Sequence, residues 1–101
     1  MKDLTASGME RTVRVFTHPA CQGCGPVVKM CWEIAANVPD VELRTIALET
    51  KAGLATAQRE KIRTIPTVTL MQGDREIQRF IGSPGRAELE EAITALAAQP
   101  V

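Results

Sequence analysis

Two kinds of apolar pattern alternate along this chain, and their order limits the folds that it can adopt. Segments that alternate in polarity or are rich in β-branched residues predict strands. Segments whose apolar residues recur every three or four positions predict helices. The strands are expected at residues 12–17, 41–48, 65–71 and 76–81, and the helices at residues 25–38, 50–61 and from Pro84 onward.

The predicted order is therefore β-α-β-α-β-β-α, which is typical of an α/β fold. A helix follows each of the first two strands, so these strands should be parallel neighbours joined by a right-handed crossover. The last two strands form a hairpin around Gly73, a residue that suits a positive φ. We expect a four-stranded mixed sheet with helices on both faces.

The helices differ in the strength of their apolar faces. The middle helix has a weak face, formed by Leu54, Ala55 and Ile62. In the last helix Ser83 is expected as the cap and Pro84 in the first turn. The residues of this helix expected to face inward are Leu89, Ala92, Ile93 and Leu96.

Length and composition exclude several classes of protein. With 101 residues and 45% hydrophobic residues, the chain can form one packed domain, expected at residues 12–101 after a flexible arm at residues 1–11. Twelve basic and twelve acidic residues give no net charge, which disfavours nucleic-acid binding. No apolar stretch is long enough for a membrane span, and no secretory leader is visible. We expect a soluble, cytoplasmic monomer.

Cys21-Gln22-Gly23-Cys24 lies where the first predicted strand gives way to a helix, and this position favours redox chemistry. Free N–H groups and the helix dipole favour a thiolate at the first helical turn. A thiolate at Cys21 could attack a substrate disulfide, and Cys24 could then resolve the mixed disulfide within the same chain. Gln22 and Gly23 are candidate modulators of the pair, as is His18, although a solvated loop histidine is the simpler interpretation.

A metal site within one chain is disfavoured, so none is expected. A structural zinc ion needs four ligands, and His18 with the two cysteines gives only three. Cys31 lies seven residues past Cys24, about 10 Å along a helix, on the apolar stripe where a thiol is buried and inert. Two alternatives stay open: a metal ion or iron–sulfur cluster held by Cys21 and Cys24 of two chains, and a redox-inactive interaction module.

The start of the helix also stays open. If Cys21 caps the helix, Pro26 is its fifth residue and costs one backbone hydrogen bond. If Gly25 caps it, Pro26 is the first helical residue and Cys24 is the more favoured thiolate. Further along the same helix, Trp32 is expected to pack at the edge, whereas Lys29 is expected to be solvated.

From Thr12 to about Ala97 the chain resembles the thioredoxin superfamily. The resemblance rests on the C-x-x-C after a strand, on the segment from Lys61 to Val68 that contains Ile65-Pro66-Thr67, and on glycines at positions 73 and 82. It implies a cis Pro66 that faces the two sulfurs, and an Ile65 backbone that pairs with an extended substrate. It also implies a thiol–disulfide oxidoreductase that reduces protein disulfides, with Cys21 attacking first and Cys24 resolving. A thioredoxin-reductase-type donor would recharge it, with no cofactor beyond the Cys21–Cys24 disulfide.

The sequence also departs from the family pattern. It lacks the extra N-terminal strand and helix of full-length thioredoxins and resembles the trimmed, minimal thioredoxin-like layout of glutaredoxin-like members. Ala20 precedes the first cysteine instead of Trp, and Gln22-Gly23 replaces the Pro-Tyr of the glutaredoxin loop. Val15 occupies the place of a buried Asp that relays protons in thioredoxins. Proton transfer to the resolving thiol would then use water or another group.

Overall fold

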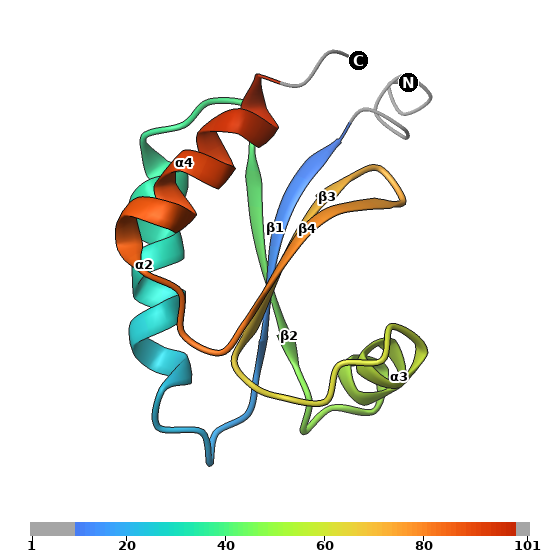
Figure 1. Cartoon of the computed structure of the whole chain (residues 1–101). Helices are drawn as coiled ribbons and strands as arrows, with labels where there is room; N and C mark the ends of the chain where they lie inside the picture. Colours follow the sequence, from blue (N-terminus) through green and yellow to red (C-terminus); the bar gives the residue numbers. More distant parts are fainter. Residues whose placement is uncertain (1–9, 99–101) are drawn as a thin grey trace.

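Four strands form one mixed sheet in the order β2-β1-β3-β4 in the computed structural model, which describes residues 10–98 (Figure 1). The helices between and after them complete the predicted order of elements. Most of the predicted N-terminal arm, residues 1–9, lies outside the described residues, and Arg11 already belongs to the first strand. The strands are β1 (Arg11–Thr17), β2 (Glu42–Ala47), β3 (Thr67–Gln72) and β4 (Arg75–Ile81).

The two predicted strand pairs are confirmed. Strand β1 runs parallel to β2, with Val13 opposite Leu43. The structure adds a third pair, in which β1 runs antiparallel to β3. Strands β3 and β4 form a hairpin, in which Gly73 takes a φ of 59°. Because β1 lies between β2 and β3, it is a central strand with a hydrogen-bonded neighbour on each side.

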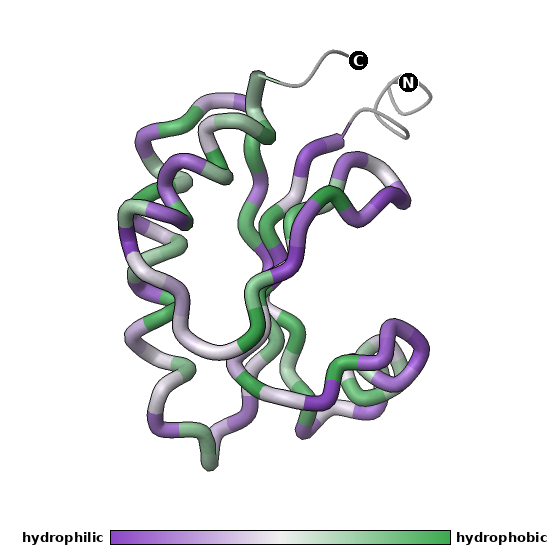
Figure 2. The backbone as a smooth tube through the Cα atoms, viewed as in Figure 1, coloured by the Kyte–Doolittle hydropathy of each residue, from purple (hydrophilic) through white to green (hydrophobic). Residues whose placement is uncertain are grey.

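Helices cover both faces of the sheet, as the sequence predicted. Helices α2 (Cys24–Ala36) and α4 (Arg86–Ala97) lie side by side on one face, and α3 (Lys51–Arg59) lies on the other, beside β2 (Figure 1). Apolar and polar stretches alternate along α2 and α4, as expected of helices with one buried stripe (Figure 2). No helix within residues 10–98 is long and apolar enough to cross a membrane.

The two faces of the sheet differ in chemistry. The face under α2 and α4 carries the hydrophobic core: Val13, Val15, Val27, Cys31, Ile34, Val68, Leu70, Leu89, Ile93 and Leu96. The face toward α3 is partly polar, because the alternate residues of β1 and β3 are Thr12, Arg14, Phe16, Thr67, Thr69 and Met71. Thr67 and Thr69 are fully buried there. The first face is therefore apolar, whereas the second holds buried hydroxyls and a charge.

The middle helix does not use the face that the sequence suggested. Its buried residues are Gly53 and Ala57, whereas Leu54 is 44% exposed. The reason is a close approach to strand β2, since a Cβ at Gly53 would overlap the backbone carbonyl of Ala47. Helix α3 is thus held near the sheet by small residues and buries little apolar surface.

The start of the last helix is also two residues later than predicted. Gly85 is the N-cap, with extended backbone (φ −70°, ψ 147°) and no side-chain cap, so the predicted cap at Ser83 is wrong. The chain stays extended there because it must cross from the end of β4, where Gly82 takes a φ of 87°, to the apolar face. Pro84 consequently lies before the first turn. The predicted inward side chains Leu89, Ile93 and Leu96 are buried.

Candidate functional site

A disulfide joins Cys21, in the loop between β1 and α2, to Cys24, the first residue of α2. Their Cα atoms are 5.5 Å apart, a separation that a disulfide spans without backbone rearrangement. The loop is held by its own hydrogen bonds: the Cys21 N–H donates to the His18 carbonyl at 2.9 Å, and the Ala20 N–H donates to His18 Nδ1 at 3.0 Å. The pair therefore lies where a fixed loop meets the first turn of α2, and we call residues 18–24 the redox loop.

The two cysteines differ in accessibility. Cys24 is 4% exposed, because it is the first residue of α2 and faces the core. Cys21 precedes the helix and is only partly covered. An external sulfur can therefore approach Cys21 far more easily than Cys24.

Helix α2 begins at neither of the two positions considered from the sequence. Gly23 is the N-cap and Cys24 is the first helical residue, so Pro26 is the third. The first residues of a helix have no intrahelical acceptor for their N–H groups, and Pro26 therefore forfeits no hydrogen bond there. The proline fixes the helix start without cost, and Cys21 lies just outside it.

An open groove of about 790 Å³ runs beside the disulfide. Both cysteines contribute to its lining, so a molecule lying in the groove lies next to the redox pair. The groove is largely apolar, with one exposed cation from α2 and one exposed anion from the loop after β2. Its lining residues are Thr17, His18, Pro19, Cys21, Gln22, Cys24, Gly25, Val28, Lys29, Trp32 and Glu49.

Trp32 lines this groove and does not pack at the helix edge, so that prediction is wrong. Its side chain is 61% exposed, because it lies on the helix face away from buried Cys31 and Ile34. A signal for this was present in the sequence: Gly25, Lys29 and Trp32 are spaced by four and three residues and so share one helix face with the start of the redox loop. Lys29 is solvated, as predicted.

The bond between Ile65 and Pro66 is cis, which confirms the expectation drawn from the resemblance. The proline approaches the redox loop at Gly23, where a Cβ would lie 3.9 Å from Pro66 Cδ and 3.7 Å from Ser83 Oγ. The Gly82 N–H donates to the Pro66 carbonyl at 2.9 Å. Ile65 and Pro66 do not line the groove. The redox loop therefore meets the Pro66 segment at Gly23 and the groove at Cys21.

Ile65 is partly buried, and its backbone is unpaired within residues 10–98. The segments on either side are fixed: the Thr67 hydroxyl donates to the Thr64 carbonyl, and the Pro66 carbonyl is bonded as described. A free N–H and a free C=O beside a redox loop can pair with an extended peptide.

Two further cysteine-related predictions concern the core. Cys31 is fully buried, as predicted, and burial raises the pKa of its thiol to about 11. Val15 is fully buried in the core under α2, where the resemblance would place an acid. The side chains of this core are all apolar or thiol, so none of them can relay a proton to Cys24.

Among residues 10–98 no three His, Cys, Asp or Glu side chains are close enough together to hold a metal ion. The lone pair of His18 Nδ1 accepts the Ala20 N–H, so the imidazole ring helps to hold the loop. Gln22 is exposed at the tip of the loop.

Comparisons with known proteins find similarity in structure only. No protein-family model matches the sequence, and no curated protein matches it. An oxidised thioredoxin O2 from Arabidopsis thaliana superposes with a TM-score of 0.80 at 18% identity, over 93% of this chain and 83% of that one. A mutant thioredoxin from Halobacterium salinarum gives 0.79 at 18%, over 98% and 84%, and a Malassezia sympodialis thioredoxin gives 0.75 at 21%, over 92% and 81%. The chain therefore has the thioredoxin fold.

Proposed function

We propose that this chain is a thiol–disulfide oxidoreductase that reduces protein disulfides through Cys21 and Cys24. The observation that carries the proposal is the asymmetry of the pair: the two residues are bonded to each other beside an open groove, but Cys21 is partly exposed whereas Cys24 is buried. A dithiol arranged in this way has one attacking sulfur and one resolving sulfur.

In the first step the reduced protein attacks its substrate. The Cys21 thiolate attacks one sulfur of the substrate disulfide, and a Cys21–substrate bond forms while the substrate S–S bond breaks. The released substrate thiolate takes a proton from water. The groove beside Cys21 is large enough to hold water molecules at the reacting atoms.

In the second step the protein releases its substrate. The Cys24 thiolate attacks the Cys21 sulfur, the mixed disulfide breaks, and the second substrate thiolate leaves and is protonated. The product is the Cys21–Cys24 disulfide described above, and two electrons have passed from the dithiol to the substrate. Because the core around Val15 supplies no acid or base, the Cys24 proton leaves through water from the groove.

The oxidised pair must then be reduced again. A partner dithiol on a thioredoxin-reductase-type donor would supply two electrons by the same exchange in reverse, and the chain itself would need no cofactor beyond its own disulfide. Sustained reduction of substrates also requires a compartment that keeps thiols reduced, such as the cytoplasm.

The substrate class follows from the surroundings of the loop. The unpaired N–H and C=O of Ile65 suit the backbone of an extended polypeptide, and the largely apolar groove, with Trp32 on its wall, suits the side chains beside the substrate cysteine. Both features favour protein disulfides over small disulfides such as oxidised glutathione.

The test is a trapping experiment. In a Cys24→Ser variant the first step is intact but the second is blocked, so a mixed disulfide with target proteins should accumulate through Cys21. A Cys21→Ser variant should form none, and Cys31→Ala should turn over like the wild type because Cys31 is buried.

Three outcomes would contradict the proposal. Full disulfide-reducing turnover by Cys21→Ser would show that Cys21 is not the nucleophile. No loss of free thiols upon mild oxidation would favour a redox-inactive module. Metal at about half an equivalent per chain, in protein purified under reducing conditions, would favour a site shared between two chains.

A further inference from the structure

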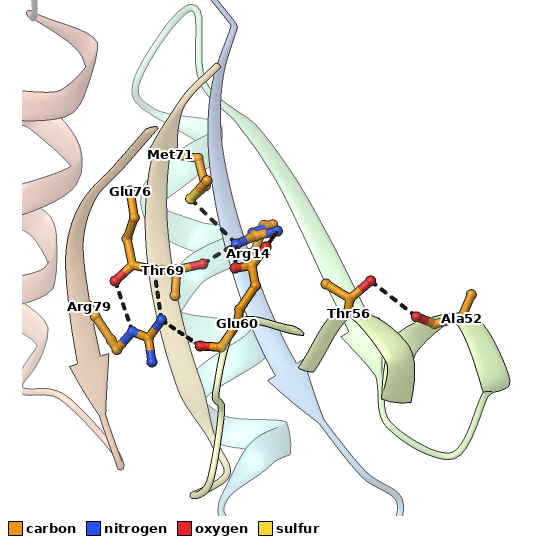
Figure 3. Close-up of polar contacts among 8 residues, drawn as sticks. All are labelled: Arg14, Ala52, Thr56, Glu60, Thr69, Met71, Glu76 and Arg79. Carbon is orange, nitrogen blue, oxygen red and sulfur yellow. Dashed lines mark hydrogen bonds and ion pairs between the residues drawn. The ribbon is translucent and has the colours of Figure 1, made fainter. Parts of the chain in front are cut away.

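A chain of polar contacts joins the sheet face under α3 to the segment that carries Ile65. We propose that Arg14 and Arg79, by binding Glu60, position the segment 61–66 for substrate. We call these three residues the Glu60 clamp. The inference rests on the proposed function, in which the Ile65 backbone pairs with the substrate. Figure 3 shows the clamp with its neighbours.

Arg14 holds the Glu60 carboxylate with both ends of its guanidinium group. Nη1 donates to Oε2 at 3.2 Å, and Nη2 contacts Oε1. The other contacts of Arg14 fix the guanidinium itself: Nε donates to Thr69 Oγ1 at 3.2 Å, and Nη2 lies 3.4 Å from Met71 Sδ. A planar, bidentate ion pair of this kind fixes the orientation of the carboxylate as well as its distance from the guanidinium group.

Arg79 holds the same residue by its backbone. Nη2 donates to the Glu60 carbonyl at 3.0 Å, one of the carbonyls left without a partner at the end of α3. Glu76 orients the Arg79 side chain, because its two carboxylate oxygens accept hydrogen bonds from Nε and Nη2 of Arg79 at 2.8 Å each. Glu60 is thus held through its side chain from β1 and through its backbone from β4.

The segment that follows Glu60 transmits this position to Ile65. Lys61 takes a left-handed φ of 60°, its N–H donates to the Gln58 carbonyl, and the Ile62 N–H donates to the Ala57 carbonyl. These two bonds form a Schellman motif, which ends α3 in a defined direction. Only Arg63 and Thr64 then separate this turn from Ile65. The place of Ile65 is consequently set by where α3 ends.

Apolar packing alone would hold α3 poorly. The helix has nine residues, and its buried residues are Gly53 and Ala57. The start of α3 is fixed, because the Thr50 hydroxyl accepts the Gly53 N–H at 2.9 Å and donates to the Ala47 carbonyl at 2.8 Å. The Glu60 clamp fixes the other end, which is the end nearer to Ile65.

The burial of the pair indicates that its role is to set position. The Arg14 and Glu60 side chains are 14% and 22% exposed, so both have lost most of their hydration. For such pairs the cost of desolvation offsets much of the attraction between the charges, and the net gain in stability is small. What the pair contributes is orientation, because only one arrangement of the two side chains lets both charged groups make their hydrogen bonds.

The experiment compares substrates that do and do not need Ile65. In Arg14→Met the KM for a peptide disulfide should rise about five- to tenfold, the loss expected for one backbone hydrogen bond to substrate. The rate with a small aromatic disulfide and the reduction potential of Cys21–Cys24 should not change. Thermal unfolding, measured in parallel, sets an assay temperature at which every variant is folded.

Arg44→Met is the matched control. Arg44 is paired in register with Arg14 on the neighbouring strand, but its ion pairs with Glu42 and Glu10 are exposed, so its loss should leave KM unchanged. Glu60→Gln keeps an acceptor for Arg14 but loses the charge, and a smaller rise in KM is expected. If Arg14→Met does not fold, Glu60→Gln carries the test with the same readouts.

The outcomes separate the two proposals. An unchanged KM in the folded clamp variants, with a wild type that reduces both substrates, overturns the clamp alone. Equal losses with the peptide and the small disulfide also overturn it, because they show a general structural defect. A wild type that reduces neither substrate overturns the proposed function, and the clamp falls with it.

Discussion

Cys31 makes the stability of this fold sensitive to alkaline pH, and the size of the effect follows from its burial. The pKa of the buried thiol is raised from 9.0 to about 11. The unfolded chain therefore releases this proton at a lower pH than the folded chain, and stability falls as the pH rises from about 9 to about 11. Two pKa units correspond to a loss of about 2.7 kcal/mol, of which about half is lost by pH 10.

The assay is urea unfolding at pH 8 and pH 10 in a Cys21→Ser/Cys24→Ser background, where no disulfide can exchange. The chain has no tyrosine, so the lysines are the other side chains that titrate in this range. Comparison with a further Cys31→Ala substitution cancels their contribution. We expect the stability advantage of the cysteine over the alanine at this position to shrink by about 1.4 kcal/mol between the two pH values. Parallel pH profiles would refute the reasoning.

Three other perturbations test separate features. Gly53→Ala should destabilise by about 1–3 kcal/mol in urea unfolding, although alanine normally favours a helix, because the new Cβ would overlap the Ala47 carbonyl; a gain in stability would contradict this close approach. Trp32→Ala should raise KM for protein disulfides severalfold and leave the melting temperature nearly unchanged, since the indole is exposed; a large drop in melting temperature would show that it packs. The hydrogen bond from Arg79 lowers the pKa of Glu76, so the stabilising contribution of the carboxylate is present above about pH 4.5 and is lost in acid. Between pH 6 and pH 3 the Glu76→Gln variant should therefore lose less stability than the wild type, by a difference under about 1 kcal/mol in urea unfolding.

The apolar half of the molecule could be predicted from the sequence, because periodicity reports burial against one continuous surface. The alternation of Val13 and Val15 and the helical spacing of Leu89, Ile93 and Leu96 predicted buried residues correctly. The parallel pair of β1 and β2 and the hairpin of β3 and β4 followed from the order of the elements, whereas the pairing of β1 with β3 was seen only in the structure.

The polar half could not be predicted in the same way. Helix α3 is held by Gly53 and by a charge pair between Arg14 and Glu60, 46 residues apart, and neither feature produces an apolar stripe. The exposed Trp32 was misjudged because a large aromatic side chain usually packs. The cis bond at Pro66 was expected from the family resemblance alone, since nothing in the local sequence distinguishes it from a trans proline at the start of a strand.

The two faces of the sheet hold different parts of the candidate site by different interactions. Cys24 begins helix α2, which packs on the apolar face, whereas the segment that leads to Ile65 is held through charged groups on the other face. Substitutions in either layer act mainly on their own half, because apolar packing and charge pairing are separate interactions with no residue in common. Under the proposed function, the reduction potential of the cysteine pair and the choice of substrate could therefore be changed by separate substitutions.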